Sequence, residues 1–208
     1  MSKIFSIEGN IGAGKSTILE YVQNMAPEYL ICPEPLDEWA ELKTDNGDTL
    51  LEAFYKDQKT HAFTFQISVL VSRYKQLQTN RHLFPNRVLI QERSFLGDFD
   101  TFVSTLASYG YFTRAQLQVY LNVFNLFKKQ TPAPIFFFVD TPSEVCLERI
   151  GQRGRSGEEH ITLSYLQDLR SGIYLLLSGF PDRVYILDGM KTPRELASEM
   201  VEIINKII

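Results

Sequence analysis

The sequence predicts an α/β protein with a parallel sheet that helices cover on both faces. Short apolar runs of β type alternate along the chain with longer segments of helical periodicity. This alternation is typical of parallel sheets, because parallel neighbours need a long crossover between them. The run at residues 135–139 is entirely apolar, as a strand buried on both faces requires. A glycine-rich loop follows the first run, where such sheets bind their ligands.

Local signals set the limits of five expected strands. The first covers residues 4–7 and ends at Gly9, and the second covers residues 29–32. Pro33 and Pro35 stop the second strand, because proline cannot donate a ladder hydrogen bond. The other three strands are expected at residues 87–91, 135–139 and 184–187.

Helical patterns fill the segments between the strands. The first helix opens at the end of the glycine-rich loop, and the last one is amphipathic. The expected ranges are 16–24, 63–80, 98–106, 114–129, 143–150, 163–177 and 193–207. No repeat, linker or low-complexity tract interrupts them. Residues 1–208 are therefore expected to form a single domain.

Composition and charge exclude several classes of function. The chain has 208 residues, of which 44% are hydrophobic and 22% charged, as in one globular domain. A formal net charge of −4 argues against binding to a nucleic-acid polymer or an anionic membrane. No apolar run approaches the roughly 18 residues of a membrane span. With no signal peptide expected and only Cys32 and Cys146 as cysteines, the prediction is a cytoplasmic protein.

The loop after the first strand matches a phosphate-binding motif. Residues 9–16 fit the pattern G-x-x-x-x-G-K-[ST] and open a helix. Glycines let backbone amides curve around an anion, and the helix N-terminus adds partial positive charge. Lys15 is expected to reach the β- and γ-phosphates and Ser16 to ligate Mg²⁺. The predicted nucleotide-binding residues are Gly9, Asn10, Ile11, Gly12, Ala13, Gly14, Lys15, Ser16 and Thr17.

The motif indicates a nucleoside triphosphate but leaves the reaction open. GTPases read their base with Asn-Lys-x-Asp, which residues 205–208 do not supply. Motor ATPases and helicases usually need a longer chain. A small phosphotransferase is the class that remains.

Two segments after strands suggest an acceptor site. Glu34 lies between two prolines after the second strand and is placed to act as a general base, or merely to cap a loop. Trp39 either walls a pocket for a flat base or belongs to the core. Glu92 and Arg93 follow the third strand. Beside a phosphate loop they would hold Mg²⁺ and the transferring phosphoryl group; elsewhere they would be a surface ion pair.

A third segment is rich in arginine. Arg149, Arg153 and Arg155 lie within seven residues, and glycines interrupt the chain around them. The bland interpretation is a solvated charged face. Next to a phosphate loop we favour a lid, at about residues 151–160, whose arginines neutralise phosphate charge.

The long helix carries polar residues within an apolar stripe. Gln66 and Arg73 are seven residues apart and therefore share a face. A side-chain amide suits the paired donor and acceptor of a nucleobase edge. Either residue alone is more often a structural polar group.

Taken together, these motifs resemble the deoxyribonucleoside kinase family, which includes deoxycytidine kinase, deoxyguanosine kinase and the insect multisubstrate kinase. The resemblance covers about residues 3–165 and weakens toward the C-terminus. Its ordered matches are GNIGAGKST, PEPLDEW, the 63–66 run with Ser72 and Arg73, ERSFLGD, and RIGQRGRSGEE. The resemblance implies a P-loop NTPase-type three-layer fold with strand order 2-3-1-4-5. It also implies transfer of the γ-phosphate of ATP to the 5′-hydroxyl of a deoxyribonucleoside.

The same resemblance implies a role for each matching residue. Glu34 would accept the 5′-hydroxyl proton, Arg93 would hold the phosphoryl group, and Glu92 would order Mg²⁺ with Ser16. The arginines of the lid and Lys15 complete the catalytic set. The implied substrate-binding residues are Glu34, Trp39, Leu51, Tyr55, Phe65, Gln66, Arg73, Arg93, Asp98, Phe102 and Glu158. Tyr55 and Glu158 would bind the 3′-hydroxyl, although Glu159 is an alternative for the acid. A homodimer is also implied.

Arg73 and Asp98 match the pair found in deoxycytidine and deoxyguanosine kinases. An acceptor such as Asp98 suits an exocyclic amino group, whereas thymine presents a carbonyl and a methyl group. Deoxycytidine and purine deoxynucleosides are therefore expected to be preferred over thymidine. Two rivals stay open: a nucleoside monophosphate kinase, whose acceptor is a phosphate, and a catalytically silent structural subunit.

Overall fold

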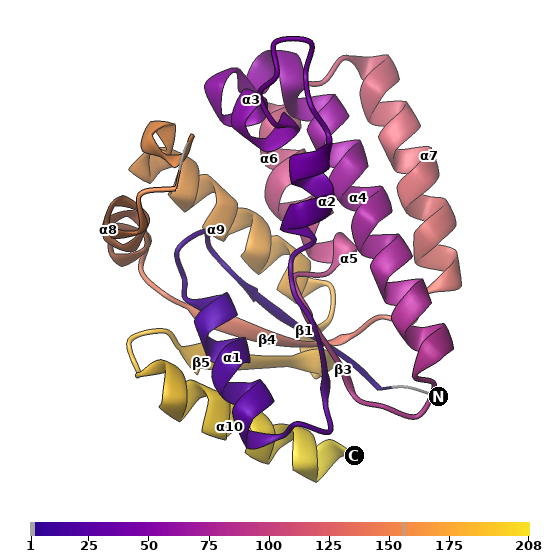
Figure 1. The fold of residues 1–208 in the computed structure, drawn as a ribbon, viewed down its shortest axis with the longest axis vertical. Helices are drawn as coiled ribbons and strands as arrows, with labels where there is room; N and C mark the ends of the chain where they lie inside the picture. The colour runs from indigo at the N-terminus through magenta and orange to yellow at the C-terminus, as the bar shows by residue number, and fades with distance from the viewer. Residues whose placement is uncertain (1–2, 156) are drawn as a thin grey trace.

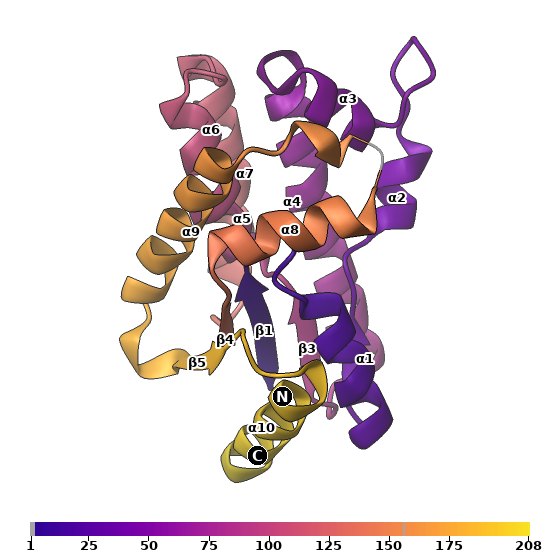
Figure 2. The same ribbon diagram turned by 90° about the vertical axis from the view of Figure 1, so that its left-hand side faces the viewer.

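The computed structural model describes residues 3–155 and 157–208. Its centre is a sheet of five strands, all parallel, in the order β2-β3-β1-β4-β5 (Figures 1 and 2). The strands are β1 Ile4–Gly9, β2 Leu30–Cys32, β3 Leu89–Glu92, β4 Ile135–Asp140 and β5 Val184–Asp188. The predicted fold class and strand order are confirmed.

Successive side chains of the strands pack into two different helical layers. Phe5 and Phe137 point into a cluster with helices α1 and α10. Phe136 and Phe138 point the other way, into a cluster with α4, α7 and the C-terminal half of α9. Because both faces are covered, the central strands carry apolar residues in both phases. The helices are α1 Lys15–Met25, α4 Gln58–Leu83, α7 Arg114–Gln130, α9 Leu163–Ser178 and α10 Pro193–Ile207.

Two short helices that the sequence analysis missed precede α4: α2 Leu36–Glu41 and α3 Leu50–Lys56. A capping box opens α3, in which the Thr49 hydroxyl accepts from the Glu52 amide and the Glu52 carboxylate accepts from the Thr49 amide. Helix α4 begins before the predicted residue 63, because the Asp57 carboxylate caps it by accepting from the Thr60 amide. Helices α2 and α3 lie in the upper part of the molecule in Figure 1, and α4 runs from there down toward the N-terminus.

The helix predicted at residues 98–106 is not one regular helix. It consists of α5 Phe95–Asp98, a π-helical segment Phe99–Val103 and α6 Ser104–Ser108. The wide π turn packs against Gly172 of α9, where a Cβ atom would collide with the Asp100 carbonyl oxygen. Single π turns of this kind are frequent at functional sites.

The predicted lid segment is partly helical. Helix α8 Ser143–Arg153 includes its first residues, and a 3₁₀ turn at Glu158–His160 forms its end. Ser156, within the predicted range 151–160, lies outside the described residues. In the described part of the chain, no helix is long and apolar enough to cross a membrane.

Candidate active site

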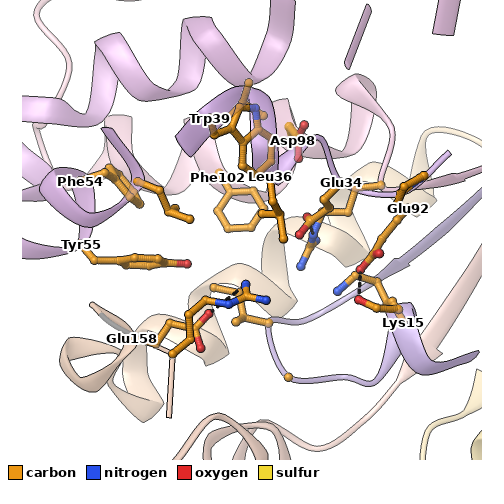
Figure 3. A pocket seen from close by; sticks show the side chains of 18 of the residues that line it. Lys15, Glu34, Leu36, Trp39, Phe54, Tyr55, Glu92, Asp98, Phe102 and Glu158 are labelled. Carbon is orange, nitrogen blue, oxygen red and sulfur yellow. Dashed lines mark hydrogen bonds and ion pairs between the residues drawn. The ribbon is translucent and has the colours of Figure 1, made fainter. Parts of the chain in front are cut away.

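A cavity of about 560 Å³ opens beside the glycine-rich loop that follows β1. Its wall includes most of the residues predicted from the sequence: Ile11, Gly12, Gly14, Lys15, Ser16, Thr17, Glu34, Trp39, Leu51, Tyr55, Phe65, Gln66, Arg73, Glu92, Arg93, Asp98, Phe102, Arg149, Arg153, Arg155 and Glu158. Figure 3 shows Glu34 between the aromatic side, with Trp39 and Phe102, and the loop side, with Lys15 and Glu92. The topology thus brings five separate sequence segments to one site.

Three predicted loop residues support the cavity without lining it: Gly9, Asn10 and Ala13. The Asn10 side chain donates to the Leu166 carbonyl oxygen at 2.8 Å, which ties the loop to α9. Gly12 requires the absence of a side chain, since its φ is 77° and a Cβ atom would lie 2.5 Å from the Cys146 carbonyl oxygen.

Lys15 folds back onto the loop that carries it. Its Nζ donates to the Asn10 carbonyl oxygen at 2.9 Å and lies 3.4 Å from that of Gly9. Burial and the nearby Arg93 lower the pKa of Lys15 to about 8, against the opposing effect of Glu92 and other carboxylates. A phosphate in the loop would replace these weak carbonyl partners with a full negative charge.

Ser16 and Glu92 meet at the end of the loop. The Ser16 hydroxyl donates to Glu92 Oε1 at 2.8 Å, so both oxygens lie at one point beside the phosphate loop. Mg²⁺ binds to few protein ligands and takes the rest from phosphates and water. This pair therefore fits the cation that accompanies a bound triphosphate. The described residues contain no group of three or more His, Cys, Asp or Glu that would form a metal cage.

The acceptor side is a buried chain of ion pairs. Arg73 Nη2 lies 2.9 Å from Glu34 Oε1, and Arg73 Nε lies 2.5 Å from Asp98 Oδ2. Arg93 Nε lies 3.5 Å from the same Glu34 oxygen. Burial alone raises the pKa of Glu34, but the adjacent cations, Arg73 first, outweigh it and lower the pKa to about 2. Glu34 is thus ionised at neutral pH. Burial raises the pKa of Asp98 to about 6 despite Arg73 and Arg93.

Arg93 projects from an unusual backbone conformation. Its φ is 62°, the left-handed region, and among the described residues it is the one non-glycine residue with a positive φ. The guanidinium carbon lies 4.9 Å from the centre of the Phe102 ring. A strained backbone of this kind persists only where the surrounding structure holds it, and such residues are concentrated at functional sites.

Aromatic side chains form the far wall of the cavity. Phe54 and Phe65 stack with ring centres 4.8 Å apart, and the Trp39 indole donates to the Ser72 hydroxyl at 2.9 Å. Among them lies Gln66, which is 2% exposed. Its Oε1 is buried without a hydrogen-bond partner in the described structure. An unpaired amide oxygen in an aromatic pocket is suited to a base edge.

Arg149, Arg153 and Arg155, from α8 and the residues that follow it, line the cavity. Arg153 binds Glu158 with two nitrogens, at 2.6 to 3.1 Å, and Arg155 lies 3.5 Å from the same carboxylate. Arg149 donates to the Ala13 carbonyl oxygen of the loop at 3.3 Å. Tyr55 faces Glu158 across the cavity (Figure 3), and burial together with this carboxylate raises the pKa of Tyr55.

The choice between the two neighbouring glutamates follows from burial. The Glu158 side chain is 2% exposed and lines the cavity, whereas that of Glu159 is 64% exposed and lies beside His160. Glu158 is therefore the residue available to a ligand in the cavity.

Four lining residues were not predicted: Pro33, Leu36, Phe54 and Val69. Leu36 and Pro33 belong to the same PEPLDEW motif as Glu34, and Val69 to the apolar stripe of α4. Phe54 gave no signal, because helix α3 was not predicted. The capping box at Thr49 was the pattern that would have revealed it.

The strand order and the phosphate loop at the end of β1 match the fold of a P-loop kinase. Comparison with known proteins narrows this class. The sequence model described as deoxynucleoside kinase matches residues 5–206. The chain therefore belongs to the deoxynucleoside kinase family, and it is a deoxyribonucleoside kinase that uses a nucleotide and small-molecule nucleosides. The predicted family and enzyme class are confirmed.

Individual relatives agree with this assignment. Deoxycytidine kinase 2 of Gallus gallus is 30% identical over 79% of this chain and 69% of its own length. Putative kinase protein 143R of invertebrate iridescent virus 6 is 30% identical over 99% of this chain and 98% of its own. In fold, the chain is similar to the structure of deoxyadenosine kinase from M. mycoides with bound dCTP, with a TM-score of 0.80 and 23% sequence identity. The match covers 98% of this chain and 99% of the other.

Proposed function

We propose that this kinase transfers the γ-phosphoryl group of ATP to the 5′-hydroxyl of deoxycytidine or a purine deoxynucleoside, in preference to thymidine. The observation that carries the proposal is the position of Glu34. Its ionised carboxylate lies between the phosphate loop and the aromatic end of the cavity. A hydroxyl at that point has a proton acceptor on one side and a phosphoryl donor on the other.

The donor triphosphate would bind along the loop, with residues 9–17 around its phosphates. Backbone amides and Lys15 bind its oxygens, and Arg149, Arg153 and Arg155 face it from α8 and the segment beyond. Ser16 and Glu92 would hold Mg²⁺, which when bound neutralises phosphate charge. We propose that the segment 151–160 acts as a lid, since its two arginines, Arg153 and Arg155, line the cavity and pair with Glu158 of the same segment.

Glu34 orients the nucleophile more than it activates it. The 5′-oxygen attacks the γ-phosphorus, the bond to the β–γ bridging oxygen breaks, and the hydroxyl proton passes to the Glu34 carboxylate. A carboxylate with a pKa of about 2 is a weak base. Phosphoryl transfer, however, proceeds through a loose transition state in which positioning matters more than deprotonation. Arg93, held beside Glu34, would bind the transferring group.

The sugar would lie between Tyr55 and Glu158. Both side chains face the cavity and are suited to hydrogen bonds with a 3′-hydroxyl. Tyr55 also packs against Gly157, where an added Cβ atom would lie 3.2 Å from Tyr55 Cβ and 3.4 Å from ring atom Cδ2. We expect a sugar held between Tyr55 and Glu158 to have little space for a 2′-hydroxyl, and therefore a preference for deoxyribose.

The base would occupy the aromatic end of the cavity. Gln66 offers its unpaired amide oxygen, and Phe102 provides a face for stacking. Leu51, Trp39 and Phe65 complete the wall. Asp98, which pairs with Arg73, lines the same cavity. Its carboxylate would accept a hydrogen bond from an exocyclic amino group, whereas thymine would leave it unpaired.

The two rival functions find less support in the site. A monophosphate kinase would need cations free to bind an acceptor phosphate, but Arg73 and Arg93 are both paired with Glu34. A silent subunit would have lost catalytic groups, whereas Lys15, Glu34 and Arg93 are all present and face one cavity.

We also propose a homodimer formed through α4 and α7, whose outer faces carry exposed Val71, Val119 and Leu126. Val119 and Leu126 lie seven residues apart and so share one face of α7. The proposal rests on the family resemblance and on this apolar surface.

Product analysis tests the chemistry. The protein is incubated with ATP, Mg²⁺ and deoxycytidine, and the product is identified by ³¹P NMR; cytidine serves as the matched substrate control. We expect a 5′-monophosphate ester from deoxycytidine and much slower turnover of cytidine. A 3′-ester, or equal rates for the two sugars, would contradict the proposed orientation.

A further inference from the structure

Beneath the active site lies a buried carboxylate that takes no direct part in the proposed phosphoryl transfer. Glu8 lies near the end of β1 and is fully buried. Its Oε1 accepts hydrogen bonds from the Ser6 hydroxyl at 2.7 Å, the Ser94 amide at 2.9 Å and the Ser94 hydroxyl at 2.8 Å. Burying a carboxylate is costly even when it is hydrogen-bonded. All three hydrogen bonds go to Oε1 and come from neutral donors, whereas Oε2 is buried without a hydrogen-bond partner in the described structure. At longer range the charge of Glu8 opposes the effect of burial on the pKa of Lys15 and contributes to raising the pKa of Arg73.

The bond from the Ser94 amide fixes the peptide unit that follows Arg93. On the other side of Arg93, its own amide donates to the Ile7 carbonyl oxygen of β1 at 3.1 Å. The left-handed residue, with φ of 62°, is thus held at both ends by two consecutive residues of β1. An arginine leaves this conformation readily unless its neighbouring peptide groups are fixed.

The same carboxylate orients the start of α5. The Ser94 hydroxyl donates to Glu8 and accepts from the Gly97 amide at 3.0 Å, and so caps the helix that carries Asp98. The second oxygen of Glu8 lies against this turn, since a Cβ atom at Gly97 would come within 2.5 Å of Oε2. Carboxylate and turn are therefore fitted to each other without space for another methyl group.

We propose that Glu8 is a positioning residue for phosphoryl transfer: it locks the Arg93–Ser94 turn and thereby directs Arg93 and Asp98 into the cavity. The inference rests on the proposed function, because it assigns Arg93 to the phosphoryl group. Glu8 does not line the cavity and acts only through the turn.

The alternative is a purely electrostatic role. Burial lowers the pKa of Lys15, and Glu8 is one of the carboxylates that oppose this shift. Two conservative variants separate the two roles. Glu8→Gln keeps an oxygen in place and removes the charge, whereas Glu8→Asp keeps the charge and withdraws the oxygen from the Ser94 amide.

The experiment measures kcat, the KM for ATP and the thermal midpoint for both variants, with Ser6→Ala as control. Ser6→Ala removes one donor to the same carboxylate but leaves the turn intact. We expect Glu8→Asp to lower kcat about 100-fold, the effect of a displacement near 1 Å. Glu8→Gln should stay within about tenfold of the wild type, and Ser6→Ala within about twofold. The KM for ATP should change little in all three, because the phosphate loop is untouched.

If the kcat of Glu8→Asp equals or exceeds that of Glu8→Gln, the positioning role is overturned and the electrostatic role is supported. A wild type that phosphorylates no deoxynucleoside would refute the proposed function but not the geometric claim. That claim is tested by a crystal structure of Glu8→Asp, in which we expect residue 93 to leave the left-handed region. Retention of the wild-type φ at residue 93 would overturn it.

Discussion

Glu34 is held by two arginines in a cavity that contains a phosphate loop and an aromatic pocket. Its place between Pro33 and Pro35 was visible in the sequence, but its ionisation was not. That property depends on Arg73, which comes from α4, thirty-nine positions along the chain. A glutamate at the end of a strand was enough to predict the site from the sequence. The lowered pKa of Glu34 could not be predicted, because it depends on the fold that brings Arg73 beside it.

Replacing Glu34 by Gln tests its role at the reacting hydroxyl. We expect kcat to fall by about 10²- to 10⁴-fold, because an amide neither accepts the hydroxyl proton nor forms the ion pairs with Arg73 and Arg93 that orient the side chain. Initial rates at saturating ATP and nucleoside measure the effect. Glu41→Gln, at an exposed position of α2, is the control and should retain the wild-type kcat. A Glu34→Gln variant of full activity would exclude the proposed role.

The pKa of Glu34 also predicts a pH dependence of stability. The folded pKa of about 2 lies below the ordinary value of 4.5, so the folded state binds this proton less readily than the unfolded state. The stabilisation is therefore present above pH 4.5 and is lost as the pH falls toward 2. Denaturant unfolding of the wild type and Glu34→Gln should show a difference that shrinks over this interval. A difference independent of pH would contradict the ion-pair assignment.

Arg73 and Asp98 are expected to set base preference. The double substitution Arg73→Met with Asp98→Ala removes the acceptor and leaves apolar space. We expect the ratio of kcat/KM for thymidine to that for deoxycytidine to rise at least about tenfold, as one lost hydrogen bond to a charged group implies. Competition assays with both nucleosides measure it. An unchanged ratio would show that other residues select the base.

Individual elements differ in how well the sequence predicts them. The loop at residues 9–16 was predictable because its conformation requires glycine at particular positions, such as Gly12. Helix α2 has no side-chain cap and is only six residues long; its order comes from packing of Trp39. The π turn at Phe99–Val103 depends on contact with α9, and no local pattern encodes it.

A substitution at Gly172 tests the close packing of α9 against the π turn. We expect Gly172→Ala to destabilise the protein by about 1–3 kcal/mol, because its methyl group would meet the Asp100 carbonyl oxygen. Gly151→Ala in α8 is the matched control, since nothing lies within 4 Å of the added atom. It should stabilise by about 0.5–1 kcal/mol. Denaturant unfolding compares the two; a neutral Gly172→Ala would contradict the packing described.

For the whole molecule, the chain order of strands and helices predicted the layers, and motifs at strand ends predicted where the cavity lies. The sequence could not show which glutamate of the pair at 158 and 159 faces inward, because that depends on a single turn. It also could not reveal that Gln66 Oε1 is buried without a hydrogen-bond partner among the described residues, because that depends on how the surrounding side chains pack.

The assembly is tested by sedimentation equilibrium at micromolar concentration. We expect twice the 23.9 kDa mass of the chain and a monomer after Val119→Lys with Leu126→Lys, which places charge on the exposed face of α7. Leu175→Lys, on the exposed side of α9, is the control and should remain a dimer. A monomeric wild type would refute the proposed pairing.

Parallel assays of five acceptors test whether the phosphoryl group passes to a nucleoside hydroxyl. Initial rates are recorded with ATP and Mg²⁺ against deoxyadenosine, deoxyguanosine, deoxycytidine, thymidine and dTMP. We expect turnover of at least one nucleoside with an exocyclic amino group, poor turnover of thymidine and none of dTMP. Turnover of dTMP alone would contradict the proposed acceptor, because dTMP has no 5′-hydroxyl whose proton Glu34 could accept.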